Sequence, residues 1–322
     1  MAEKFYLNAT MDYKGDSYFP VMNEIINLEN FCYTQENIRN IFNYDENNIL
    51  CVGGTKVFVI NKVNMNIEKT LDTTHDANGV CYDRENKVLY YICKTDMSLY
   101  KYDFSTDENT KMDVDFGSTT MSASSTKIMD KTGNYIYIIN NSRLWKISLI
   151  DKTVNITSFS NTIYASNDKY VYGLSHNNST IAVNVINKED FNSELFKVES
   201  PSLSYSYEPI LCTNEFIFMA SSNNYIYIDL KNKSCVYKQV SYKYVLYKEN
   251  VIGINGNTIY KIVQSTSKNA DKKISAFSDS VNLTDPSSIY YVDNTFYVAL
   301  ESGIYNTTKT FEKSNYYKKL EV

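Results

Sequence analysis

The chain contains 322 residues, of which 43% are hydrophobic, so it is long enough to bury one large core or two ordinary ones. Its formal net charge of -5 leaves no basic field of the kind that attracts phosphates, so we expect no nucleic-acid partner. Uninterrupted apolar runs stay well below the ~18 residues of a membrane helix, which predicts no membrane insertion.

Residues 1–33 differ in pattern from the rest of the chain. The amino end, "MAEKFYLNATMDYKGD", has no basic segment followed by an apolar one, so we expect synthesis in a bacterial cytoplasm without a signal peptide. Within "MDYKGDSYFPV", Asp12 and Gly15 suit a tight turn, and Pro20 marks a strand edge or end. The following "NEIINLENF" suggests a short helical turn. We therefore treat residues 1–33 as a separate segment.

A unit of four strand candidates recurs seven times in residues 34–322. Each unit opens on an apolar segment and continues with two apolar or Tyr-rich strands and a more polar one. The opening segments are "IRNIFNY", "NGVCYD", "SSTKIMD", "NTIYAS", "EPILCT", "YVLYK" and "SSIYYV". Equivalent positions in the second strands lie 39, 48, 35, 46, 35 and 44 residues apart: Ile49, Val88, Ile136, Val171, Ile217, Ile252 and Phe296. A propeller blade takes about 40–45 residues.

These repeats predict an all-β fold, a seven-bladed β-propeller over residues 34–322, with six or eight blades as alternatives. The runs "KVLYYI", "YIYII" and "FIFMA" indicate second strands buried on both faces, and stacking the sheets around an axis supplies their partners. Two β-sandwiches would not repeat this signature seven times. The repeats resemble quinoprotein-like or YVTN-like propellers, without the Trp-Asp, kelch Gly-Gly or Asp-box motifs.

The last unit contains four strand candidates of its own, with "GIYNTT" and "NYYKKLEV" as the third and fourth. Residues 1–33 are then surplus to the ring and free to attach to a partner. In the alternative, "KFYLNAT", Lys4 to Thr10, adds an outer strand to the last blade and latches the ring. Both alternatives stay open at the level of sequence.

Loops between second and third strands share one face with the loops between blades, and we expect ligands there. Tyrosine rings stack on sugars, while polar side chains bind hydroxyl groups. The candidate ligand-binding residues at this face are Tyr205, Tyr207, Tyr242, Tyr244, Arg143 and His176. Tyrosines that alternate along a strand are also common packing residues, which is the competing interpretation.

Nothing in the sequence forms a catalytic set, so we expect no enzyme activity and assign no catalytic residue. Only His75 and His176 are available as neutral-pH bases, and G-x-S-x-G and phosphate-binding glycine loops are missing. The six cysteines show no metal-ligand spacing, which predicts buried structural thiols and no metal. No cofactor is expected.

The D-x-x-G turn followed by an aromatic-Pro-Val strand resembles the amino-terminal segment of tail-fibre and receptor-binding proteins of phages and phage-tail-like bacteriocins. The continuation "NEIINLENF" departs from the Thr- or His-rich pattern of those proteins. The resemblance implies attachment to tail baseplate or fibre proteins through Asp12, Gly15, Phe19, Pro20 and Val21. It also implies a homo-oligomer in the virion or tail-like particle after lysis, which presents the propeller to a host cell-surface glycan or protein.

Two other functions stay open. One is a cytoplasmic propeller scaffold for a bacterial protein partner. The other is a propeller lactonase or lyase, which would require acidic or histidine ligands around the axis.

Overall fold

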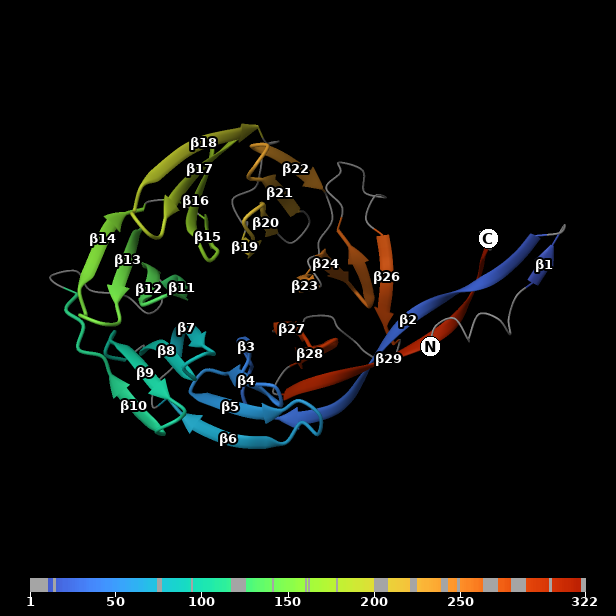
Figure 1. Cartoon of the computed structure of the whole chain (residues 1–322), viewed down its shortest axis with the longest axis horizontal. Coiled ribbons are helices and arrows are strands. Elements are labelled where there is room, and N and C mark those ends of the chain that lie inside the picture. The colour runs from blue at the N-terminus through green and yellow to red at the C-terminus, as the bar shows by residue number, and fades with distance from the viewer. Residues whose placement is uncertain are drawn as a thin grey trace.

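The computed structural model describes residues 11–13, 16–73, 77–93, 95–116, 126–140, 142–159, 161, 163–177, 179–199, 208–220, 225–238, 243–247, 250–262, 272–278, 288–300 and 303–319. Within these ranges the regular structure is entirely β, in four-stranded antiparallel units arranged around a common axis (Figure 1). The prediction of an all-β, seven-bladed β-propeller is confirmed.

Five blades are separate sheets, each with its first strand nearest the axis (Figure 1). Blade 1 contains β3 (Asn40–Asn43), β4 (Asn48–Val52), β5 (Lys56–Asn61) and β6 (Ile67–Asp72). Blade 2 contains β7 (Ala77–Asp83), β8 (Val88–Cys93), β9 (Leu99–Asp103) and β10 (Glu108–Lys111). Blade 3 contains β11 (Thr126–Thr132), β12 (Tyr135–Asn140), β13 (Arg143–Ser148) and β14 (Val154–Ser158).

The series continues in the same order around the ring. Blade 4 contains β15 (Ile163–Ser166), β16 (Tyr170–Asn177), β17 (Thr180–Asn187) and β18 (Ser193–Glu199). Blade 5 contains β19 (Glu208–Cys212), β20 (Phe216–Ala220), β21 (Tyr225–Asp229) and β22 (Ser234–Lys238). Blade 6 contains β23 (Lys243–Tyr247), β24 (Asn250–Asn255), β25 (Thr258–Lys261) and β26 (Lys272–Phe277), and blade 7 begins with β27 (Ser288–Val292) and β28 (Thr295–Leu300).

Blade 7 is completed from both ends of the chain. Its third strand is β29 (Gly303–Lys319), and beside it lies β2 (Asp16–Tyr33), antiparallel, with Tyr33 opposite Gly303. Residues 24–26 of β2 also pair in parallel with β26, which joins blades 6 and 7 into one sheet. The amino-terminal strand therefore bridges the seam between the last two blades.

Two local predictions at this seam were wrong. The stretch "NEIINLENF" is part of strand β2, because β29 on one side and β26 on the other satisfy its backbone groups as a sheet. The segment "GIYNTT" and residues 315–319 of "NYYKKLEV" belong to one continuous strand, β29, whose tail pairs with β2 instead of folding back. The strand expected at Lys4 to Thr10 lies outside the described residues.

Residues 16–23 of β2 and 312–319 of β29 extend beyond the ring, and we call this projection the arm. Tyr18 pairs with Lys319 and Pro20 with Tyr317 in this two-stranded ribbon, and β1 (Met11–Tyr13) folds back onto β2. Figure 1 shows the arm projecting from blades 6 and 7, away from the other five blades.

The core consists of apolar layers between successive blades. All six residues of β8 are buried, and a cluster containing Ile92 of blade 2 and Trp145 of blade 3 fills one such layer. Burying a Leu- or Ile-sized side chain stabilises the fold by about 1.5–3 kcal/mol.

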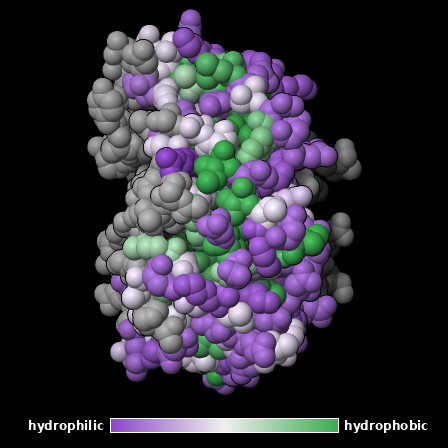
Figure 2. Space-filling model, turned by 90° about the vertical axis from the view of Figure 1, so that its left-hand side faces the viewer, coloured by the Kyte–Doolittle hydropathy of each residue, from purple (hydrophilic) through white to green (hydrophobic). Residues whose placement is uncertain are grey.

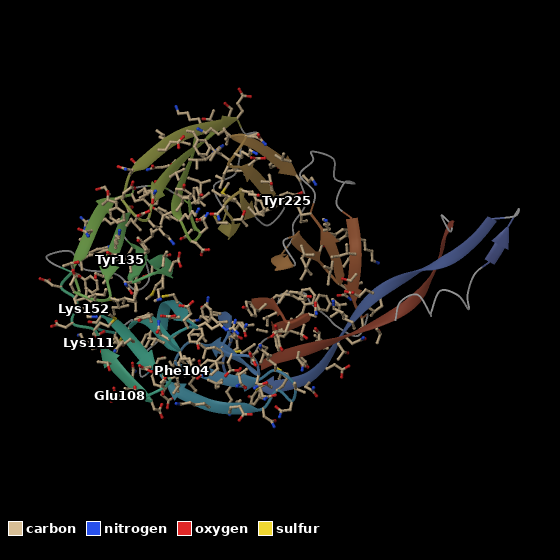
Figure 3. All side chains as sticks on the ribbon, in the orientation of Figure 1. Phe104, Glu108, Lys111, Tyr135, Lys152 and Tyr225 are labelled. Atoms are coloured by element: carbon tan, nitrogen blue, oxygen red, sulfur yellow. The ribbon has the colours of Figure 1, made fainter. Side chains whose placement is uncertain are left out.

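The outermost strand β10 is exposed throughout, with Glu108 and Lys111 at the edge of blade 2 in Figure 3. Figure 2 shows that this outer wall is mainly hydrophilic, with apolar side chains gathered along its middle. The mixture matches the blunted edges expected of outer strands.

Short turns at one face of the ring are held by side-chain caps. Asp45 accepts hydrogen bonds from the backbone amides of residues 47 and 48, and Asn167 accepts from those of residues 169 and 170. After the third strands, Asn61 and Asp103 do the same for their own turns. Such Asx turns fix the backbone locally. We call this side, formed by the loops that follow first and third strands, the turn face.

Glu36 ties the segment after β2 to blade 1. Its Oε2 accepts hydrogen bonds from the amides of Gly54, Thr55 and Lys56, at 2.8, 3.1 and 3.2 Å. A Cβ added to Gly53 would lie 2.3 Å from the same oxygen, so only glycine permits this approach. Burial acts to raise the pKa of Glu36, but hydrogen bonds from the Thr55 hydroxyl and the amides outweigh it, and the pKa is lowered.

We expect Glu36→Gln to flatten the acid limb of the stability curve. Because the folded-state pKa lies below the unfolded one, the carboxylate stabilises the protein above pH 4.5 or so, and this contribution is lost as pH falls through the folded pKa. Melting temperatures between about pH 3 and 7 test this, with the wild-type protein losing more stability on acidification than Glu36→Gln. Glu108→Gln in the exposed strand β10 is the control and should follow the wild type.

Candidate functional site

The sequence placed the ligand-binding residues opposite the turn face. Arg143 and His176 do lie at that side, because Arg143 pairs with Asn140 at the hairpin end of blade 3 and His176 pairs with Ile181 near the hairpin end of blade 4. His176 is half-buried, and its Nε2 has no hydrogen-bond partner among the described residues. Within the part of the chain that the structure describes, neither side chain takes part in a hydrogen bond or an ion pair.

The tyrosines proposed for sugar stacking are only partly placed. Tyr205, Tyr207 and Tyr242 lie outside the described residues. Tyr244 belongs to β23, where its backbone pairs with Gly253. The predicted tyrosine cluster therefore stays a prediction.

The attachment residues fall on the arm. Asp12 pairs with Ser17 in the β1–β2 hairpin, and Phe19 pairs with Lys318. Pro20 pairs with Tyr317, after which the register shifts across Val21. Gly15 lies outside the described residues. Four of the five positions thus belong to one projecting ribbon.

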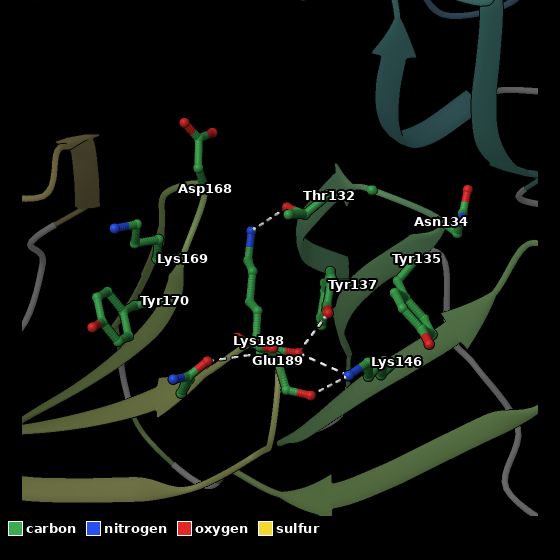
Figure 4. A pocket seen from close by; sticks show the side chains of 12 residues that line it. Thr132, Asn134, Tyr135, Tyr137, Lys146, Asp168, Lys169, Tyr170, Lys188 and Glu189 are labelled. Carbon is green, nitrogen blue, oxygen red and sulfur yellow. Dashed lines mark hydrogen bonds between the residues drawn. The ribbon is translucent and has the colours of Figure 1, made fainter.

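A cleft of 660 Å³ opens on the turn face, between blades 3 and 4. Its lining combines the β11–β12 and β15–β16 turns with the turn after β17 and side chains of β12 and β13. The residues are Thr132, Gly133, Asn134, Tyr135, Tyr137, Lys146, Asp168, Lys169, Tyr170, Asn187, Lys188 and Glu189. We call it the inter-blade cleft, and Figure 4 shows it from close by.

Lys188 forms the back of the inter-blade cleft. Its side chain is only 3% exposed, and its ammonium pairs with the Asp130 carboxylate and donates to Thr132 Oγ1 at 3.1 Å. Ser166 of blade 4 donates to the same carboxylate at 2.8 Å. A buried charge needs such partners, since isolated burial is costly. The ion pair therefore fixes blade 4 to blade 3 at the turn face.

Lys146 of β13 crosses the floor of the inter-blade cleft. Its ammonium donates to the carbonyl oxygens of Lys188 and Glu189, at 2.9 and 2.7 Å (Figure 4). Tyr137 donates to the Lys188 carbonyl at 2.6 Å, and burial raises the pKa of its phenol to about 12. These hydrogen bonds connect strands of blade 3 to the turn of blade 4, so the floor of the cleft is rigid. The Lys146 ammonium already donates its hydrogen bonds to the protein itself.

The walls carry aromatic rings and free polar groups. In Figure 4, Tyr135 stands on the blade 3 wall, with Tyr170 and Asp168 on the blade 4 wall. Tyr135 is 38% exposed, and the Lys146 ammonium lies 4.5 Å from its ring centroid. Concave sites lined by rings with a few convergent polar groups are typical of small-ligand binding.

Sequence reasoning missed the inter-blade cleft because its polar residues sit in ordinary turns. One signal was present: the segment "VINK" ends the third strand of both blade 1 and blade 4, at Lys62 and Lys188. Lys62 makes the equivalent contact, donating to Asp293 of blade 7 at 2.6 Å. The repeated lysine thus marks contacts between neighbouring blades.

The other predicted features concern metals, thiols and membranes. None of the six cysteines, all in the described part of the chain, forms a disulfide, and burial raises the pKa of the Cys32 thiol to about 11. Across the described ranges, no three His, Cys, Asp or Glu side chains gather in a way that would hold a metal ion. The same part of the chain contains no helix of membrane-spanning length and hydrophobicity.

No protein-family model matches the sequence, and no curated protein matches it. Solved structures do match. A streptogramin B lyase aligns with a TM-score of 0.64 at 11% identity, over 89% of this chain and 98% of that one. Virginiamycin B lyase from Staphylococcus aureus aligns with a TM-score of 0.60 at 9% identity, over 89% and 99%. The N-terminal domain of Nup159 gives 0.57 at 9%, over 89% and 96%.

These neighbours define the class of fold: the chain is a β-propeller. With seven four-stranded units, five of them separate and two joined by β2, it is a seven-bladed one. At such identities the likeness carries no site or activity from one protein to the other. These solved structures give no support to the resemblance between the amino end and phage tail proteins.

Proposed function

We propose that the protein is a non-catalytic attachment and display component of a phage tail or phage-tail-like particle. The arm docks on a baseplate or fibre protein, and the propeller presents a surface that binds a host cell-surface glycan or protein. The propeller fold itself supports display of a rigid surface, because each blade is packed against its neighbours on both sides.

The arm is the observation that carries this proposal. Within the described residues, 16–23 and 312–319 pair only with each other and with β1, beyond the part of β2 that pairs with β26. A ribbon of this kind is marginally stable alone. Its outer edges present backbone donors and acceptors to which a further strand can add. An arm built this way is suited to pairing with a partner protein.

The test compares the full chain with an arm-less version that lacks residues 1–23 and 312–322. This deletion keeps residues 24–33, which pair with β29 inside the ring. We expect both versions to bind whole Gram-positive cells, and only the full chain to co-sediment with tail particles from the producing strain. Binding of the arm-less version to tail particles would contradict the attachment role. If neither version binds cells, the display role is contradicted.

A further inference from the structure

We propose that the inter-blade cleft binds an uncharged oligosaccharide at the turn face of blades 3 and 4. This inference rests on the proposed display function and names the site and ligand class for it. It places recognition on the face opposite Arg143 and His176.

The aromatic rings supply the first part of the argument. Tyr135 and Tyr170 stand on facing walls, and Tyr170 packs on Tyr172 with ring centroids 6.0 Å apart. The apolar C–H face of a sugar ring packs on such exposed aromatic surfaces. The volume of 660 Å³ lies within the range of small-ligand sites, about 300–1,000 Å³.

Unused polar groups supply the second part. Asn134, Asp168 and Glu189 are exposed at the cleft, and within the described residues their side chains make no hydrogen bond. Two carboxylates accept hydrogen bonds from hydroxyl groups, and the amide of Asn134 both donates and accepts. A polyhydroxylated ligand satisfies all three.

The charges decide against an ionic ligand. Asp130 neutralises Lys188, and backbone carbonyls occupy Lys146, which leaves Lys169 against the carboxylates of Asp168 and Glu189. Since Lys146 keeps its charge, the three lysines and three carboxylates balance, so no net charge attracts phosphates or acidic sugars, and the exposed carboxylates of Asp168 and Glu189 repel them. A cationic ligand would meet the Lys146 ammonium already placed over the Tyr135 ring. An uncharged ligand avoids both repulsions.

The experiment uses an array of defined neutral oligosaccharides, with sialylated and phosphorylated ones as the comparison. We expect neutral probes to bind the full chain, and Tyr135→Ala or Asp168→Ala to weaken that binding about tenfold or more. Tyr135→Phe should retain it, because the ring remains. Ile156→Ala, at a 43% exposed position of β14 in the same blade, is the control and should bind as the wild type.

Whole-cell binding of the same variants separates the two proposals. If wild-type protein binds cells and Tyr135→Ala and Asp168→Ala bind them equally well, the cleft proposal is wrong and the display function stands. If only acidic probes bind, the ligand class is wrong. If the wild-type protein binds neither cells nor any probe, the display function fails together with the cleft.

Discussion

Removing residues 1–33 should abolish the folded ring, whereas removing residues 1–23 should leave its melting temperature unchanged. The difference is the stretch 24–33, which pairs with β29 and contributes the buried side chains Ile26 and Cys32. Truncating one buried isoleucine costs about 2–5 kcal/mol, and a domain has only about 5–15 kcal/mol in total. Losing the strand also exposes the edge of β29, which invites aggregation.

Circular dichroism and calorimetry of the two truncated proteins test this directly, and equal melting temperatures would show that β2 does not hold the ring.

A matched pair of point substitutions makes the same test without deleting any backbone. Ile26→Ala, fully buried against blade 6, should lose about 2–5 kcal/mol of unfolding free energy. Ile274→Ala, at a 41% exposed position of β26, should change it by less than about 0.5 kcal/mol.

The repeat could be predicted from the sequence because it is local. Each of the seven equivalent positions, from Ile49 to Phe296, falls at the start of a second strand, as the spacing indicated. Alternation and apolar runs report how a strand is buried, and turn residues mark where it ends. These signals recur in every blade, so a misread strand in one unit does not change the predicted fold.

The closure of the ring could not be predicted in detail because it depends on pairing between the two ends of the chain. Ile25, Ile26 and Leu28 fit a short helix as well as a strand, and pairing with the β29 and β26 backbones decides between them. The segment from Thr307 to Lys319 holds no Gly or Pro, which in retrospect indicates one continuous strand.

The inter-blade cleft escaped prediction for a different reason. Its residues come from turns and strands of two blades, and each residue alone is an ordinary polar or aromatic position. What brings them together is the packing angle between blades, which sequence spacing does not report. The expectation that ligands bind at the opposite face rested on which loops share that face and on their tyrosine and polar side chains, and three of the residues it selected, Tyr205, Tyr207 and Tyr242, lie outside the described part of the chain.

The second large effect concerns the ion pair behind that cleft. Asp130→Ala should cost about 3–5 kcal/mol of unfolding free energy, because it leaves the Lys188 ammonium buried without its carboxylate, next to Thr132 Oγ1 and the Tyr137 ring. Lys188→Met should cost less, since Asp130 is 30% exposed and keeps its hydrogen bond from Ser166. The double variant Asp130→Ala/Lys188→Met should recover most of the loss.

Urea denaturation of the three variants gives this double-mutant cycle. Asp293→Ala is the matched control from the seam between blades 7 and 1. Asp293 is 60% exposed, and its partner Lys62 still donates to the carbonyls of Asp45 and Glu46 after the substitution, so the cost should stay below about 1 kcal/mol. If Asp130→Ala proves no more costly than Asp293→Ala, the buried pair does not hold blades 3 and 4 together. The floor of the cleft would then owe its rigidity to the bonds of Lys146 and Tyr137.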